Sequence, residues 1–198
     1  MRMPEITEQY KEEWTLLQYS EIDDQLTVLE GTVLAHSADR NEIFKALSRI
    51  KGTQLAIEYT GAFPQDLPVC SDIDSFWRLP PDVGDCTRAA TRVAIKGPQG
   101  ICVLTLLIEC YPTGCSQCTI LPEEVFQPIG YDPHGDREQL DLLAERGLIT
   151  VPLIPVEWIQ VFGQTLQGFK VAAHTSATDP PIVGFVGDDV LDQLRASG

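Results

Sequence analysis

Three cysteines close together in the sequence are the residues best suited to chemistry. Cys110, Cys115 and Cys118 have the spacing C-x4-C-x2-C and follow an apolar run that is typical of a buried strand. Thiolates gathered in one loop can bind a single ion, and structural zinc takes four sulfur or nitrogen ligands in a tetrahedron. Cys110, Cys115 and Cys118 are therefore the candidate metal ligands of this chain.

The spacing of these cysteines resembles that of the first three ligands in plant-type [2Fe–2S] ferredoxins. No cysteine follows Cys118, so a fourth ligand has to come from upstream, where Cys70, Cys86 and Cys102 lie. The alternatives are an iron–sulfur cluster, or a zinc site completed by Cys70 or Cys86. The interpretation that we favour has no cofactor, because Cys102 and Cys110 in a strand would be buried as small apolar side chains.

Without a metal, the loop still predicts thiol chemistry. We expect Cys115 and Cys118 to be partly exposed, and a disulfide can join them under oxidation if their Cα atoms come within about 7 Å. A nearby negative charge disfavours a thiolate. Acidic neighbours in the sequence are therefore expected to raise the thiol pKa values: Glu109, Glu123 and Glu124.

The remaining motifs indicate turns and surface positions rather than sites. The three histidines, His36, His134 and His174, share no ligand spacing, and His134 lies in a Pro- and Gly-containing turn. The sequence contains no G-x-G-x-x-G motif, P-loop or G-x-S-x-G motif, so nucleotide binding and serine hydrolysis lack their usual support.

The overall composition narrows the class of partner. The chain has 198 residues, is 43% hydrophobic and carries a net charge of −15, which argues against disorder and against binding to nucleic acid or to a membrane surface. The same charge favours a basic protein partner. No apolar run approaches the ~18 residues of a membrane span, and the first residues lack the apolar core of a secretory signal. We therefore expect a cytoplasmic protein with reduced cysteines.

Three regions are expected to position these residues in an α+β fold. Residues 1–66 predict a small module: a β-hairpin over 26–35 that turns at Glu30-Gly31, a helix that Asp39 caps, and a strand over 54–59. Residues 67–90 hold several prolines and read as a linker or packed loop, in which Phe76 should be buried.

Residues 91–198 predict a mainly-β domain with short helices. The strands 91–96 and 101–109 form a hairpin, and helices are expected after Pro122, over 136–146 and over 188–195. Further strands are expected between 148 and 186.

The order of parts from Thr91 onward resembles that of the retropepsin-like proteins, single-domain relatives of the aspartic proteases. The apolar strand VLTLLI leads to a loop containing Thr113-Gly114, and TILPEEVFQPIGYDP resembles the strand and short helix that follow the active loop in that family. VEWIQVFGQ and LQGFKVAAH precede PIVGFVGDDVLDQL, which is similar to the family's closing strand, glycine turn and terminal helix. The resemblance implies a retropepsin-like half-barrel over 91–198 and a homodimer.

The residue on which catalysis depends in that family is missing. Its motif is Asp-Thr-Gly, and the aspartate shares a proton with a second aspartate across the dimer to activate water. Here Pro112 precedes Thr113-Gly114, and Tyr59 precedes a second Thr-Gly at 60–61. Neither Pro112 nor Tyr59 can form half of a carboxylate pair, and Glu109 lies four residues before Thr113. The helix expected over 136–146 falls where the family places its flap.

Three functional hypotheses follow from these observations. The favoured one is a non-catalytic retropepsin-like protein that acts as a binding or assembly module for a protein partner, so that the chain is not an enzyme. The second is a small metal or redox protein that uses Cys110, Cys115 and Cys118 to bind zinc or a [2Fe–2S] cluster. The third is an atypical aspartic protease that uses Glu109.

Overall fold

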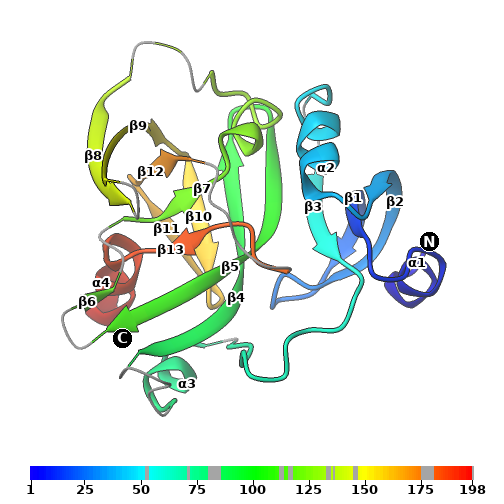
Figure 1. Ribbon diagram of the computed structural model, residues 1–198, viewed down its shortest axis with the longest axis horizontal. Coiled ribbons are helices and arrows are strands. Elements are labelled where there is room, and N and C mark those ends of the chain that lie inside the picture. Colours follow the sequence, from blue (N-terminus) through cyan, green and yellow to red (C-terminus); the bar gives the residue numbers. More distant parts are fainter. Residues whose placement is uncertain are drawn as a thin grey trace.

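The computed structural model describes residues 1–51, 54–70, 72–79, 86–111, 114–115, 118–132, 135, 137–144, 147–174 and 181–197. In this part of the chain the fold is mixed α+β, with thirteen strands in one open sheet and a few short helices (Figure 1). None of the helices in these residues has the length and apolar character needed to cross a membrane.

The first part of the chain places one helix on a three-stranded antiparallel segment of the sheet. The elements are α1 (Met3–Gln9), β1 (Trp14–Ile22), β2 (Val28–Ser37), α2 (Arg40–Leu47) and β3 (Gln54–Tyr59), and β1 lies between β2 and β3. Asp39 caps α2 by accepting the backbone N–H of Asn41 at 2.9 Å, and Ile43, Phe44 and Leu47 are buried. The predicted helix and the strand over 54–59 are confirmed.

The hairpin predicted around Glu30-Gly31 is wrong, because both residues lie inside β2. The turn lies over 23–27 instead. The Asp23 carboxylate accepts the backbone N–H groups of Gln25 and Thr27 at 2.9 and 2.8 Å, and Leu26 has a φ of 62°. A side-chain carboxylate therefore organises the turn without a glycine.

The long hairpin of the second part runs through the middle of the sheet. It consists of β4 (Thr87–Gly97) and β5 (Gly100–Tyr111), as predicted. On its other side β5 pairs in parallel with β3 over its first half and with β13 (Phe185–Val186) over its second half. The shorter elements nearby are α3 (Ile73–Trp77), β6 (Gly114–Cys115), β7 (Ile120–Leu121) and the 3₁₀ helix η1 (Glu123–Val125), which is all that forms of the helix predicted after Pro122.

The helix predicted over 136–146 is wrong, because this stretch contains strand β8 (Gln139–Ala144), which pairs with β9 (Gly147–Pro155). Leu140 and Leu142 alternate along β8 and pack beside buried Val151, so strand pairing overrides the local helical preference. The later strands and the terminal helix are confirmed as β10 (Trp158–Val161), β11 (Gln164–Gln167), β12 (Lys170–Ala173) and α4 (Asp188–Ser197).

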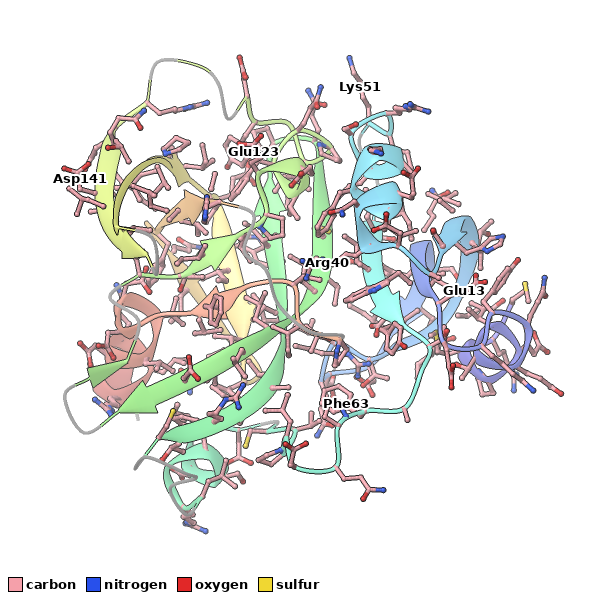
Figure 2. The ribbon with its side chains drawn as sticks, viewed as in Figure 1. Glu13, Arg40, Lys51, Phe63, Glu123 and Asp141 are labelled. Atoms are coloured by element: carbon pink, nitrogen blue, oxygen red, sulfur yellow. The ribbon has the colours of Figure 1, made fainter. Side chains whose placement is uncertain are left out.

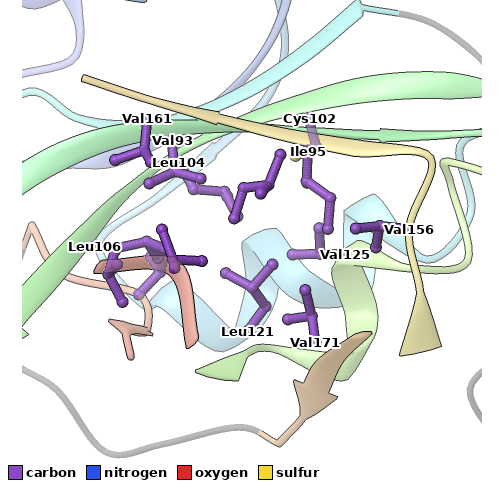
Figure 3. Packing of buried hydrophobic residues seen from close by; sticks show 14 of the residues in the cluster. Val93, Ile95, Cys102, Leu104, Leu106, Leu121, Val125, Val156, Val161 and Val171 are labelled. Atoms are coloured by element: carbon purple, nitrogen blue, oxygen red, sulfur yellow. The ribbon is translucent and has the colours of Figure 1, made fainter. Parts of the chain in front are cut away.

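One hydrophobic core joins the two parts of the chain. It contains Leu16, Ile43 and Leu55 of the first part together with residues of β5, η1 and β12, and Figure 3 shows the packing in the second part. Arg40 adds a polar connection, because its guanidinium donates to the carbonyl of Ile182 at 3.0 Å. In the segment between the parts Phe76 is fully buried, as expected.

Candidate functional site

The cysteine loop begins where β5 ends. The backbone reverses at once, and β6 pairs with β5 so that Cys115 lies opposite Cys110 and Gly114 opposite Tyr111. Pro112 and Thr113, where the family's catalytic aspartate and threonine would be sought, lie outside the described residues.

Cys110, the first of the predicted metal ligands, is disulfide-bonded and only 7% exposed. A sulfur in a disulfide is not a thiolate donor, so a metal site that uses Cys110 would require reduction first. The described residues contain no group of three or more His, Cys, Asp or Glu side chains placed to hold a metal ion.

Cys118 is a buried cysteine that forms no disulfide. Its expected exposure is wrong, since the residue is 7% exposed, and it takes no part in a disulfide with Cys115. Burial, followed by the nearby Asp189 carboxylate, raises the pKa of Cys118 to about 11. The predicted rise of the thiol pKa is confirmed for Cys118, but the nearby negative charge is that of Asp189 rather than that of Glu109, Glu123 or Glu124. At neutral pH this thiol is protonated and a poor nucleophile.

Behind the cysteine loop, Thr119 and Asp189 connect β7 to the start of α4. The Thr119 hydroxyl donates to Asp189 Oδ1 at 2.8 Å, and the Thr119 backbone N–H donates to both carboxylate oxygens at 3.0 and 3.1 Å. The same hydroxyl accepts the backbone N–H of Gly187 at 3.1 Å. Burial raises the pKa of Asp189, and these donors oppose the rise. Sequence reasoning missed this contact, because 70 residues separate its partners.

The two loops pass so closely that one of them requires glycine. A Cβ atom on Gly187 would lie 2.1 Å from the backbone carbonyl carbon of Cys118, far inside any normal contact. The close approach fixes the position of Cys118 relative to α4.

Glu109, the proposed carboxylate of an atypical protease, forms an ion pair with Arg88 on the neighbouring strand, with a closest N···O distance of 3.2 Å. The two residues are direct partners in the β4–β5 ladder. Two carboxylates beside the loop are thus bound by other protein groups: Glu109 by Arg88 and Asp189 by Thr119.

The second Thr-Gly, at 60–61, also has a structural role. Thr60 exchanges backbone and side-chain hydrogen bonds with Glu13, which ties the end of β3 to the start of β1. The Tyr59 ring packs on Trp14 with centroids 5.3 Å apart, and buried Glu58 pairs with Arg92 at 3.2 Å.

A cleft of about 430 Å³ lies between the end of the α2 segment and η1. Three carboxylates and one ammonium line it, from Glu123, Glu124, Asp132 and Lys51. Figure 2 shows Lys51 on the first part of the chain and Glu123 on the second. The Glu123-Glu124 pair was visible in the sequence, but its position beside Lys51 depends on the packing of α2 against η1, which no local pattern reveals. We call these four residues and their cavity the acidic cleft.

The described histidines do not form a cluster. His36 Nδ1 lies 2.7 Å from Glu13 Oε2, and its ring lies against Tyr10 on the surface. His174 donates its backbone N–H to the carbonyl of Leu121 in β7, and His134 lies outside the described residues.

The chain matches no family model, and no curated protein matches its sequence.

Proposed function

We propose that this protein is a non-catalytic binding module that recognises a basic segment of a protein partner at the acidic cleft. The observation that carries the proposal is the lining of this cleft, to which three carboxylates and one ammonium contribute at the junction of the two parts of the chain. A lysine or arginine side chain of a partner would find complementary charge there, and the net charge of −15 would steer its approach.

The lack of catalysis rests on how the carboxylates near the loop are bound. An aspartic protease requires two carboxyl groups that share a proton and face a common water. Glu109 is held by Arg88, and Asp189 accepts three hydrogen bonds from Thr119. Neither carboxylate has the arrangement that this chemistry needs.

A retropepsin-like architecture for residues 91–198 is part of the proposal. It is supported by the place of β13, which lies between β5 and β7, is parallel to β5 and leads through Gly187 into α4. It is also supported by the β8–β9 hairpin, which occupies the region where that family has its flap. A homodimer would be the corresponding assembly, and β8 and β11 end the strand order of the sheet among the described residues, with backbone groups open to pairing.

The proposal is tested with a lysine- and arginine-rich peptide and a neutral peptide of the same length, each titrated into the full chain by calorimetry. The decisive variant is Glu123→Gln combined with Glu124→Gln, and the matched control is Glu8→Gln with Glu12→Gln, which removes the same charge from the exposed α1 end. We expect the basic peptide alone to bind, and binding to weaken about tenfold only in the cleft variant, corresponding to about 1.4 kcal/mol.

Two results would contradict the proposal. Equal weakening in both variants would show that binding depends on net charge alone. Cleavage of a peptide substrate at acid pH that Glu109→Gln abolishes would show an active protease.

A further inference from the structure

The face of the sheet opposite α2 contains a second cleft, of about 390 Å³. Its lining comes from Leu26 in the turn after β1 and from five strands that are neighbours in the sheet, in the order β1, β3, β5, β4 and β10. We call it the sheet cleft. It lies on a different face from the core that packs under α2, and it shares no lining residue with the acidic cleft.

The register of the strands explains why this part of the sheet is hollow. Trp158 on β10 pairs with Lys96, Lys96 pairs with Ile101, and Ile101 pairs with Gln54 on β3, so these residues form one row across the sheet. Two residues along the strands, in the next row on the same face, Ala94 pairs with Gln160 and its small side chain forms part of the lining. A small residue between larger ones leaves a depression in an otherwise close-packed face.

Tyr19 lines the sheet cleft from β1 with an unused polar group. The residue is 5% exposed, and burial raises its pKa to about 12, so its hydroxyl is neutral at physiological pH. Within the part of the chain that the structure describes, this hydroxyl has no hydrogen-bond partner. The fully buried side-chain polar atoms without a partner in the described residues are Arg92 Nε and Arg137 Nε, so the Tyr19 hydroxyl is reached by solvent from the cleft and can bond to a molecule that enters it.

The other lining groups restrict the chemistry of that partner. Trp158 is half-buried and offers a flat aromatic surface with an N–H, while Gln54 and Gln160 each supply an amide that donates and accepts. The only ionisable side chains in this lining are Tyr19 and Glu21, and Glu21 together with the net charge of −15 would repel an anion. A flat apolar surface flanked by amides fits a neutral ring that has C–H groups on its faces and hydroxyls on its edge.

We propose that the sheet cleft binds a neutral carbohydrate of one or two rings, packed against Trp158 and hydrogen-bonded by Tyr19, Gln54 and Gln160. A cavity of this volume is within the usual range for small-molecule sites, which combine an apolar lining with a few convergent polar groups. The inference is independent of the proposed function, because it uses another face and other residues.

The test is a panel of neutral monosaccharides and disaccharides, including glucose, galactose, mannose, N-acetylglucosamine, maltose, cellobiose and lactose. Saturation-transfer NMR on the full chain detects contact, and titration gives the affinity. Tyr19→Phe removes only the unpaired hydroxyl and should leave the fold intact, and Gln160→Ala removes one amide. Gln18→Ala is the matched control, because Gln18 is exposed on the same strand next to Tyr19 and lies outside the lining.

We expect saturable binding of at least one sugar, weakened about tenfold in Tyr19→Phe and in Gln160→Ala and unchanged in Gln18→Ala. The same two variants should bind the basic peptide normally, which separates this inference from the proposed function. Absence of saturable binding across the panel overturns the inference, and so does binding that is insensitive to Tyr19→Phe and Gln160→Ala.

Discussion

Thr119 holds Asp189 through its backbone and its side chain at once, with three hydrogen bonds of 2.8 to 3.1 Å to one carboxylate. Its hydroxyl also accepts the backbone N–H of Gly187, so a single side chain just before β7 bonds both to the residue before α4 and to Asp189 in the first turn of α4. The contact makes the position of the cysteine loop depend on the terminal helix.

Thr119→Val should therefore lower the free energy of unfolding by about 1–3 kcal/mol, because Asp189 loses a donor and the Gly187 N–H loses its acceptor. Asp189 has a raised pKa, so its contribution to stability is present below the unfolded pKa and is lost as pH rises through the folded pKa. Removing a donor raises that pKa further, so the loss of stability in Thr119→Val should be larger at pH 7 than at pH 4.

Urea unfolding at the two pH values measures this loss, with Thr119→Ser as the control that keeps the hydroxyl. Equal stability of wild type and Thr119→Val would contradict the prediction.

The cysteine loop makes a second prediction, about thiols and metal. A disulfide that includes Cys110 uses two of the six cysteines, so unfolded, unreduced protein should titrate four thiols, and reduced protein six. Protein purified without oxygen should contain no stoichiometric zinc and show no visible iron–sulfur absorption. Stoichiometric metal that Cys110→Ser, Cys115→Ser and Cys118→Ser each remove would establish the metal hypothesis instead.

The sequence allowed prediction of those helices and strands that are determined by residues close to one another in the chain. The Asp39 cap and the apolar spacing of Ile43 and Leu47 gave α2, and the apolar run of β5 was evident. The stretch 139–144 failed because its leucines fit a helix as well as a strand, and only the pairing with β9 decides between them. The clefts could not be predicted, since each combines residues from elements distant in the chain.

Limited proteolysis tests how far the two parts of the chain depend on each other. The segment around Gln65 and Asp66 is exposed, whereas just beyond it the Cys70 N–H donates to the Ala90 carbonyl and the Ala90 N–H donates to the Pro68 carbonyl. The first cuts should fall between residues 62 and 69. Because β3 pairs with β5 and the core is shared, the two fragments should stay together in native size-exclusion chromatography and separate in denaturant. First cuts within 101–109 or 43–50, or fragments that separate under native conditions, would contradict the prediction.

The ion pair between buried Glu58 and partly buried Arg92 connects the two parts of the sheet, with a closest N···O distance of 3.2 Å. Arg92 also donates to the Thr27 hydroxyl at 2.9 Å, while its Nε is buried without a partner in the described residues. Burial raises the pKa of Glu58, and Arg92 opposes that rise. Protonated Glu58 therefore contributes to the free energy of unfolding below pH 4.5, the ordinary pKa of its carboxyl group. This contribution is lost as pH rises through the pKa of Glu58 in the folded protein.

Arg92→Ala leaves the Glu58 carboxylate buried without its counter-charge and should lower the free energy of unfolding by about 3–5 kcal/mol at pH 8. The pKa of Glu58 then rises further, so the loss should shrink as pH falls and Glu58 takes up a proton. Chemical unfolding at pH 8 and pH 5 measures both effects.

Arg88→Ala is the control, because its pair with Glu109 is more exposed and should contribute no more than about 1 kcal/mol. The double variant Glu58→Leu with Arg92→Met should recover most of the stability, since an apolar pair of similar size leaves no charge unpaired. An Arg92→Ala loss that is the same at both pH values, or a double variant as unstable as Arg92→Ala, would show that the effect comes from packing rather than from the buried carboxylate.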